Sequence, residues 1–274
     1  SANYHTTLVE AFLTNEDGSL QPPKSVAHEG DGPHERQEKP HVHYAGFTPD
    51  EKYVVVVDLG NDTVTTYEPH GAELKQVSQL KVKAGSGPRH IAFHPHAPYA
   101  YVMTELSNEV IVMKFDAAAG TFEEVEYVST IPEDFTENNQ GSAIHITSDG
   151  KFIYVGNRGH NSIGVFRILD DCHIELVDWT HTEGKWPRDF ALDPSERFIV
   201  ASNQHSGTLT LFERDQETGK LTLLQKDIEA PESLCVKFLH EYLNRGRECL
   251  PGTPFLFSLG SKILLDYLYF TKNS

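Results

Sequence analysis

The sequence predicts an all-β fold of the β-propeller class, with about five blades' worth of repeats. A segment that alternates apolar and polar residues and ends on an aromatic residue occurs five times along the chain. Successive aromatic ends are separated by 46 to 55 residues, and no segment shows a sustained helical period. A sandwich or a barrel also has many short strands, but recurrence of one unit at a near-constant interval favours a propeller.

The aromatic-ended segments each predict one strand followed by a second strand. After the aromatic residue comes a turn that contains Gly or Asp, and then another alternating run such as "AELKQVSQLKV" or "GKLTLLQKDI". Alternation with a period of two, bounded by turn residues, is typical of a strand, a turn and a strand. The aromatic ends are Phe12, Tyr67, Phe115, Phe166 and Phe212.

A second recurring feature completes each unit with two more strands. Four segments place a turn between two apolar runs: "FTPDEKYVVVV", "FHPHAPYAYVM", "ITSDGKFIYVG" and "LDPSERFIVAS". The unit therefore has four short antiparallel strands over roughly 50 residues, the size of a propeller blade. Because this feature occurs four times and the aromatic-ended strand five times, we expect the chain to begin inside a blade.

The repeats divide the chain into two parts. Residues 1–240 carry them and predict a β-propeller that is incomplete at its N-terminus. Residues 241–274, which begin "EYLNRGRECLPG", match no repeat and form a predicted non-repeat tail.

Composition excludes several classes of partner. The net charge is −17, with 23 Lys and Arg against 40 Asp and Glu, so we expect no nucleic-acid partner. The three cysteines have no CxxC spacing, which indicates a reducing compartment. The first residues lack the features of a signal peptide, and the apolar stretch 255–270 is interrupted by Lys262 and Asp266. These observations predict a cytoplasmic protein without membrane association.

Three similar clusters place a cation next to proline on the turn that enters the predicted innermost strand. They are "KPHVHYAGFTP", "GSGPRHIAFHP" and "EGKWPRDFALDP", and a fourth unit has "GSAIHI" at the corresponding place. Since inner strands of a propeller line its channel, we expect His43, Arg89, His145 and Arg188 to face one axis from similar positions. Glu105, at the end of the next strand, would add a carboxylate to this set.

Each of these residues also has an ordinary structural interpretation. A single Arg beside Pro is usually a solvated charge, and Glu105 could simply form an ion pair with an Arg. The pair His41 and His43 has the spacing of two metal ligands, but no third ligand follows, so we predict neither a metal nor another cofactor. The segment Glu35-Arg36-Gln37 could be a lid over the site or a solvated turn.

Three longer motifs carry a resemblance to a known family. They are "GDGPHERQEKPHVH", "GPRHIAFHPHAPYAYVMTELSNEV" and "AIHITSDGKFIYVGNR", in this order. Residues 1 to about 240 resemble the lactonase family of seven-bladed β-propellers, which includes propeller-type 6-phosphogluconolactonases. Family chains are longer at the N-terminus by about two blades, so the resemblance implies a truncated chain. The family also contains a fungal muconate lactonising enzyme, and the fold therefore does not fix the substrate.

The resemblance implies a catalytic set of His43, Arg89, Glu105 and Arg188. A lactone hydrolase needs an activated water, a stabilised oxyanion and an anchor for an anionic substrate. Glu105 or His43 would be the general base, and Arg89 and Arg188 would hold the oxyanion and the anionic groups. Substrate contacts are expected from His41, His145 and Arg158.

The implied substrate is a small anionic sugar lactone, 6-phospho-D-glucono-1,5-lactone of the pentose phosphate pathway. A muconate-type lactonising enzyme and a non-catalytic binding scaffold are the alternatives. The sequence has no Gly-x-Ser-x-Gly segment, which argues against a serine nucleophile.

Overall fold

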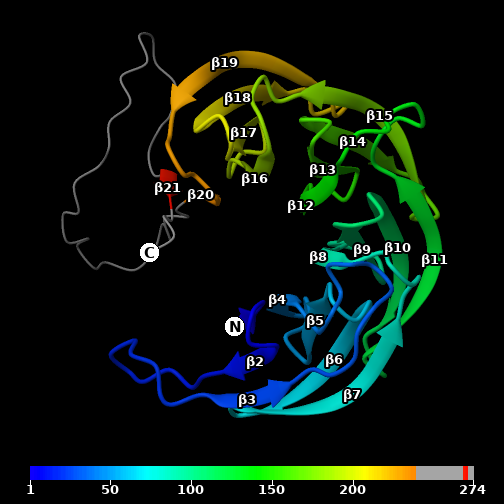
Figure 1. Cartoon of the computed structure of the whole chain (residues 1–274), viewed down its shortest axis with the longest axis vertical. Coiled ribbons are helices and arrows are strands. Elements are labelled where there is room, and N and C mark those ends of the chain that lie inside the picture. The colour runs from blue at the N-terminus through cyan, green and yellow to red at the C-terminus, as the bar shows by residue number, and fades with distance from the viewer. Residues whose placement is uncertain (239–267, 271–274) are drawn as a thin grey trace. The chain divides into compact units, whose positions relative to one another are not determined.

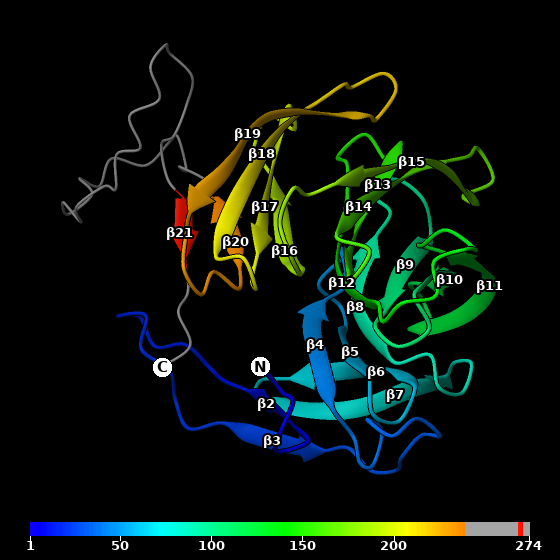
Figure 2. The same cartoon turned by 45° about the horizontal axis from the view of Figure 1, so that its top comes forward.

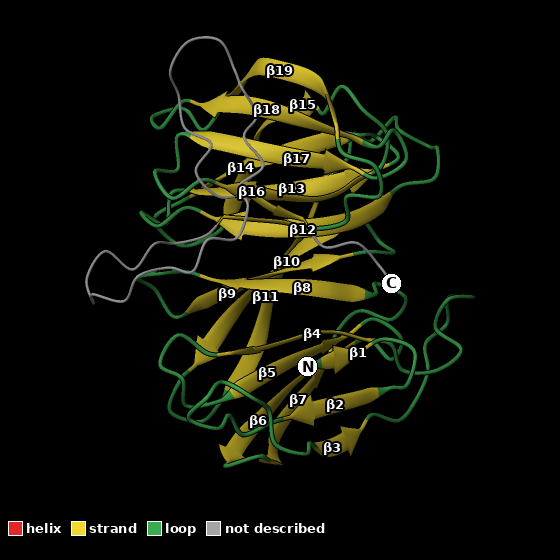
Figure 3. Cartoon of the chain, turned by 90° about the vertical axis from the view of Figure 1, so that its left-hand side faces the viewer, coloured by secondary structure: helices red, strands yellow, loops and turns green. Residues whose placement is uncertain are grey.

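The computed structural model describes residues 1–238 and the strand at residues 268–270. The chain divides into two compact units, Ser1–His181 and Thr182–Ser274. Figure 3 shows strands and loops, and none of the described residues is helical. No helix in this part of the chain could therefore span a membrane.

The first unit consists of one three-stranded and three four-stranded antiparallel sheets. The sheet orders are β1-β2-β3, β4-β5-β6-β7, β8-β9-β10-β11 and β12-β13-β14-β15, so consecutive strands are always neighbours. The strands are β1 (Ala2–Asn3), β2 (Leu8–Ala11), β3 (Lys24–Ala27), β4 (Val42–Phe47), β5 (Val54–Asp58), β6 (Thr63–His70), β7 (Glu73–Lys81), β8 (Pro88–Phe93), β9 (Tyr99–Thr104), β10 (Glu109–Asp116), β11 (Thr121–Ser129), β12 (Gln140–Ile146), β13 (Phe152–Arg158), β14 (Ser162–Ile168) and β15 (Ile174–His181).

The four-stranded sheets of the first unit share one orientation. Figure 1 shows β4, β8 and β12 on their inner side and β7, β11 and β15 on their outer side. The inner strands β4 and β8, and β8 and β12, also contact each other directly (Figure 2). Side chains on these three strands can therefore meet, although they belong to different blades.

The second unit repeats the same meander once. Its four-stranded sheet has the order β16-β17-β18-β19, with β16 (Pro187–Leu192), β17 (Phe198–Asn203), β18 (Thr208–Arg214) and β19 (Leu221–Glu229). A two-stranded sheet follows, in which β20 (Val236–Phe238) pairs with β21 (Leu268–Phe270). Strand β21 is the described part of the predicted tail 241–274, and the rest of that tail lies outside the described residues.

The second strand of each four-stranded blade begins with an apolar run because both of its faces are buried. In β5, Val55 and Val57 belong to the cluster shared with the next sheet, whereas Val56 packs with Val9 of the preceding one. Such continuous runs are typical of strands covered on both sides. The aromatic ends predicted from the sequence complete these layers, with Tyr67 2% and Phe166 0% exposed.

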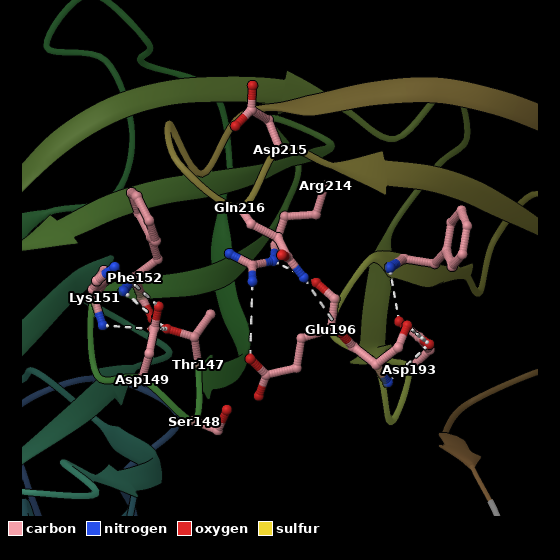
Figure 4. A network of polar contacts seen from close by, with 12 residues as sticks. Thr147, Ser148, Asp149, Lys151, Phe152, Asp193, Glu196, Arg214, Asp215 and Gln216 are labelled. Atoms are coloured by element: carbon pink, nitrogen blue, oxygen red, sulfur yellow. Dashed lines mark hydrogen bonds and ion pairs between the residues drawn. The ribbon is translucent and has the colours of Figure 1, made fainter.

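The recurring turn between the first two strands is closed by one polar side chain. Thr147 donates its hydroxyl proton to Asp149 at 2.6 Å and accepts the Phe152 N–H at 3.1 Å. In the blade of the second unit, Asp193 accepts the Phe198 N–H at 2.8 Å in the same way (Figure 4). Local bonds of this kind favour turns, which explains the recurrence of "TSDGKF" and "DPSERF".

The predicted repeat is confirmed. The five aromatic-ended segments form β2, β6, β10, β14 and β18, and the four turn-centred segments join the first two strands of the four-stranded blades.

Candidate active site

A β-bulge marks the start of every described inner strand. The register shifts between Val42 and Tyr44 in β4, between Pro88 and His90 in β8, and between Pro187 and Asp189 in β16. The residues inside these bulges are His43, Arg89 and Arg188. A bulge leaves one residue out of the ladder and redirects its side chain. The predicted site residues therefore lie in the inner strands themselves and not, as expected, on the turns that enter them.

Glu105 is the centre of a buried cluster of charges in the first unit. Its Oε2 accepts from Arg89 Nε at 3.0 Å and lies 2.7 Å from Arg158 Nη2. Its Oε1 accepts from Arg36 Nη2 at 2.5 Å. The side chains of Glu105, Arg89 and Arg158 are only 3 to 4% exposed. Buried charges are stable only when they are paired and hydrogen-bonded, and this carboxylate meets both conditions.

The three guanidinium groups keep Glu105 ionised. Burial by itself raises the pKa of Glu105, but the charges of Arg158, Arg89 and Arg36 outweigh it and hold this pKa at about 2. Three positive groups against one carboxylate leave these four residues with a net charge of +2. A locally positive site on a chain of net charge −17 is suited to an anionic ligand.

Glu105 and Arg158 occupy equivalent positions in neighbouring blades. Glu105 follows Thr104, which pairs with Pro88, and Arg158 follows Asn157, which pairs with Gly141, the counterpart of Pro88 in the next blade. Glycine at position 141 allows the two blades to approach, since a Cβ there would lie 2.1 Å from the Thr104 carbonyl oxygen. The Gly141 carbonyl in turn accepts from Arg158 Nη2 at 2.7 Å.

His43 lies beside this cluster as a neutral imidazole. Burial, followed by the charge of Arg89, lowers the pKa of His43 to about 3. Its ring lies 5.1 Å from that of His90 and 5.8 Å from that of Tyr4, and its buried Nδ1 has no hydrogen-bond partner. A neutral ring nitrogen without a partner keeps its hydrogen-bonding capacity for a ligand or a water molecule that enters the site.

His41 and His43 do not act as a pair. The bulge at His43 interrupts the alternation of the strand, and the two rings have different partners. His41 stacks on Tyr4 at 4.3 Å and contacts the Tyr4 carbonyl and the Glu38 carboxylate. Within the described residues, His, Cys, Asp and Glu form no group of three or more that could hold a metal ion.

The prediction that His145 matches His43 and Arg89 in position is wrong. Ile146 pairs with Ile153 in one blade and Phe93 pairs with Ala100 in the other, so Ile146 is the counterpart of Phe93. Arg89 precedes Phe93 as Ser142 precedes Ile146, and Ser142 is therefore the residue of β12 that matches Arg89. His145 lies three residues further along the strand and is half-buried. The motif "GSAIHI" gave the wrong alignment because its histidine, His145, follows the bulge of β12, whereas Arg89 of "GPRHI" lies within the bulge of β8. Substrate contact by His145 stays a prediction.

Arg188 belongs to the second unit, and its Nη1 donates to Gln204 Oε1 at 3.3 Å. Gln204 directly follows β17, and Glu105 directly follows β9. Arg188 and Arg89 therefore bond to residues at equivalent positions, one neutral and the other charged. Convergence of Arg188 with the cluster of the first unit stays a prediction.

Arg36, His90 and Tyr4 were missing from the predicted set. His90 directly follows Arg89 in the quoted cluster, and its ring lies within 3.3 Å of Arg89 Nη1. The sequence around Arg36 fits either a lid or a solvated turn, because its partner Glu105 is 69 residues away. Tyr4 offered no motif, and its contacts with His41 and His43 place it at the site.

The family of this chain follows from comparison with known proteins. Residues 1–238 match a family described as lactonase, 7-bladed beta-propeller. The chain belongs to this lactonase family. It is 57% identical over 243 residues to a 6-phosphogluconolactonase of Bacillus subtilis (strain 168), covering 88% of this chain and 70% of that protein.

Solved structures of the lactonase type have the same fold. A protein from Lactobacillus plantarum matches with a TM-score of 0.86 and 44% identity, over 88% of this chain and 70% of that one. A periplasmic gluconolactonase from Pseudomonas aeruginosa matches with a TM-score of 0.80 and 31% identity, over 84% of this chain and 67% of that one. These similarities confirm the predicted lactonase-type propeller fold and the resemblance on which it was based.

Proposed function

We propose that this lactonase-family chain hydrolyses 6-phospho-D-glucono-1,5-lactone to 6-phosphogluconate. The observation that carries the proposal is the net charge of +2 on Glu105 and its three arginines, next to a neutral imidazole. A phosphate monoester contributes a charge of about −1.5 to −2 at neutral pH, which complements this site. The Bacillus subtilis relative, 57% identical, bears the name of this activity.

In this proposal His43 is the general base. Its ring is neutral and its Nδ1 has no partner, whereas all three guanidinium groups occupy Glu105, whose pKa is about 2. The charge of Arg89 contributes to the low pKa of His43, so a bound anion that offsets this charge makes the ring more basic. His43 therefore becomes a better proton acceptor when substrate is present.

The reaction then follows in two steps. Water attacks the lactone carbonyl carbon while His43 takes one proton, and a tetrahedral oxyanion forms. Arg89 and Arg158 stabilise this oxyanion, because Glu105 fixes their guanidinium groups beforehand. The bond between the carbonyl carbon and the ring oxygen breaks, and the ring oxygen takes the proton back from His43 as it becomes a hydroxyl. The remaining predicted residues, Arg188, His41 and His145, are proposed as further substrate contacts.

The convergence of Arg89 and Arg158 on Glu105 counts against a non-catalytic scaffold, which needs no such cluster. A muconate-type lactonising activity would also use cations around a carboxylate, so the experiment has to include it. The predicted cytoplasmic location and the absence of nucleic-acid and membrane partners stay predictions.

The test is an assay on freshly generated 6-phosphogluconolactone, corrected for spontaneous hydrolysis. It uses this chain and the same chain extended at its N-terminus, with cis,cis-muconate as the second substrate. We expect accelerated hydrolysis of the lactone and no conversion of muconate. Failure of both forms to accelerate hydrolysis would refute the proposal, and conversion of muconate alone would replace it with the lactonising activity.

A further inference from the structure

Arg36 differs from the other two arginines on Glu105 in where it comes from. Arg89 lies in an inner strand and Arg158 ends a second strand, but Arg36 lies in the loop 28–41 between β3 and β4. Its side chain is 32% exposed, against 4% for Arg89 and for Arg158. Arg36 therefore reaches the buried carboxylate from the solvent side of the cluster.

The loop is held in place by its neighbour, Gln37. This buried side chain donates from Nε2 to the Leu59 carbonyl and to Asp62 Oδ1, both at 2.8 Å, and its Oε1 accepts the His34 N–H at 3.1 Å. Because both ends of the amide are bonded, the backbone of Arg36 is fixed. A solvated turn would not need such an anchor, so the structure favours a functional role for this loop.

Asp62 connects the loop to the strand that carries Arg89. Its carboxylate also accepts the Gly85 N–H at 2.7 Å and the Gly87 N–H at 2.8 Å. These glycines belong to the turn that leads into β8, so one buried carboxylate positions the segments of both Arg36 and Arg89.

One edge of the Arg36 guanidinium lacks a partner. Nη2 is bonded to Glu105, whereas Nη1 is buried and has no hydrogen-bond partner among the described residues. Burial lowers the pKa of Arg36, but the charge of Glu105, the bond to it and the interaction with the Tyr4 side chain outweigh burial and raise this pKa. The group stays charged, and an unsatisfied buried donor on a charged group favours an oxyanion as its partner.

We infer that Arg36 binds the phosphate of the substrate and selects phosphorylated over unphosphorylated sugar lactones. This inference rests on the proposed function. Nη2 stays on Glu105 while Nη1 takes a phosphate oxygen, so the planar guanidinium bridges the carboxylate and the phosphate. The phosphate is remote from the reacting carbonyl, and Arg36 is correspondingly the member of the cluster nearest to solvent.

The test compares two lactones on Arg36→Ala. We expect kcat/KM for 6-phosphogluconolactone to fall about 10- to 100-fold, mostly through KM, because one charge-assisted contact is lost. For glucono-1,5-lactone, kcat/KM should fall by a smaller factor of about threefold, because Arg36 affects that substrate only through its bond to Glu105. Arg36→Lys keeps the charge without the fork and should recover only part of the loss.

Lys39→Ala is the matched control. Lys39 lies in the same loop, is exposed and donates to the His5 carbonyl, so its removal changes the loop charge equally. It should leave both lactones unaffected. An equal loss on both lactones with Arg36→Ala, or no loss on either, would overturn the inference.

Calorimetry separates this inference from the proposed function. The probes are 6-phosphogluconate and gluconate, which bind without turnover. If the wild-type chain hydrolyses neither lactone, the proposed function fails. The binding measurements then test by themselves whether Arg36 binds the phosphate. A drop of tenfold or more in affinity of Arg36→Ala for 6-phosphogluconate, with gluconate unchanged, supports the inference. Equal affinity of variant and wild type, or no binding by either, contradicts it.

Discussion

Two blades carry the same proline–arginine pair but differ in the charge around the arginine. In β8 the bulge residue Arg89 bonds to Glu105, and in β16 the bulge residue Arg188 bonds to Gln204. Arg89 is buried with two other guanidinium groups on its carboxylate, whereas Arg188 is half-buried beside a neutral amide. The repeat thus determines where the arginine lies, and one residue at the end of the second strand determines its electrostatic surroundings.

The largest effect is expected when Glu105, the partner of Arg89, is replaced by glutamine, the residue type that partners Arg188. Glu105→Gln keeps the size of the side chain but leaves three guanidinium groups without their carboxylate. Removing one partner of a buried ion pair costs about 3–5 kcal/mol, so the free energy of unfolding should fall by this amount. Urea unfolding followed by circular dichroism measures it, and lactone hydrolysis should fall at least about 100-fold if the proposed function is correct.

Gln204→Ala is the control for that experiment, since it removes the equivalent side chain without unpairing a buried carboxylate. It should cost less than about 1 kcal/mol. Equal losses in the two variants would mean that the charge on Glu105 does not distinguish the blades.

Lowering the pH should reveal the contribution of ionised Glu105 to stability in the unmodified chain. The pKa of Glu105 is about 2 in the folded chain and 4.5 without its partners. A lowered carboxylate pKa stabilises the fold fully above about pH 4.5, and this contribution is lost as the pH falls towards 2. It amounts to about 3 kcal/mol. Unfolding in urea between pH 6 and pH 2 measures the slope, which Glu105→Gln should reduce.

His43 adds to the acid sensitivity at higher pH. Its pKa is about 3 in the folded chain against 6.5 when unperturbed, so only the unfolded state binds this proton between those values. Stability therefore falls as the pH drops from 6.5 towards 3. His43→Gln should reduce the dependence of stability on pH between 6.5 and 3. The loss of stability that comes from protonation of Glu105 should remain. A slope unchanged in both variants would assign the acid sensitivity to other groups.

A smaller effect is expected at the contact that brings Glu105 and Arg158 together. Gly141→Ala places a methyl group against the Thr104 carbonyl, which is backbone and cannot rotate away. Overpacking of this kind costs about 2 kcal/mol. Gly46→Ala is the matched control because the nearest atoms there belong to the Tyr44 side chain, which can move. Thermal unfolding of the two variants should separate them, and equal stability would show that the blades have room to shift.

The smallest effect is expected from the reverse exchange. Gln204→Glu gives Arg188 the kind of partner that Arg89 has. Because Arg188 is only half-buried, the new ion pair should change stability by less than about 1 kcal/mol. The change should also shrink at high salt, and urea midpoints at 0.05 M and 1 M NaCl measure it. A gain of several kcal/mol would contradict the view that burial separates the two sites.

The repeat made the fold predictable from sequence, because alternation and turn residues are local properties. The matching places of His43 and Arg89 in neighbouring blades were predictable for the same reason. The alignment of His145 was not, because the place of a bulge depends on pairing with the next strand. Arg36 was not predictable either, since its importance comes from a partner 69 residues away and from the anchor supplied by Asp62.

The bulges at the inner strands also bear on how blades can diverge after duplication. A residue outside the ladder can be exchanged without moving the alternating side chains that fill the layers between sheets. The four blades have His43, Arg89, Ser142 and Arg188 at this one column, while their layers keep the same aromatic and aliphatic filling. New specificities can therefore arise by changing single codons at this column, and a variant library restricted to these four codons would sample site chemistry, with the largest cost to folding at Arg89, which is paired with Glu105.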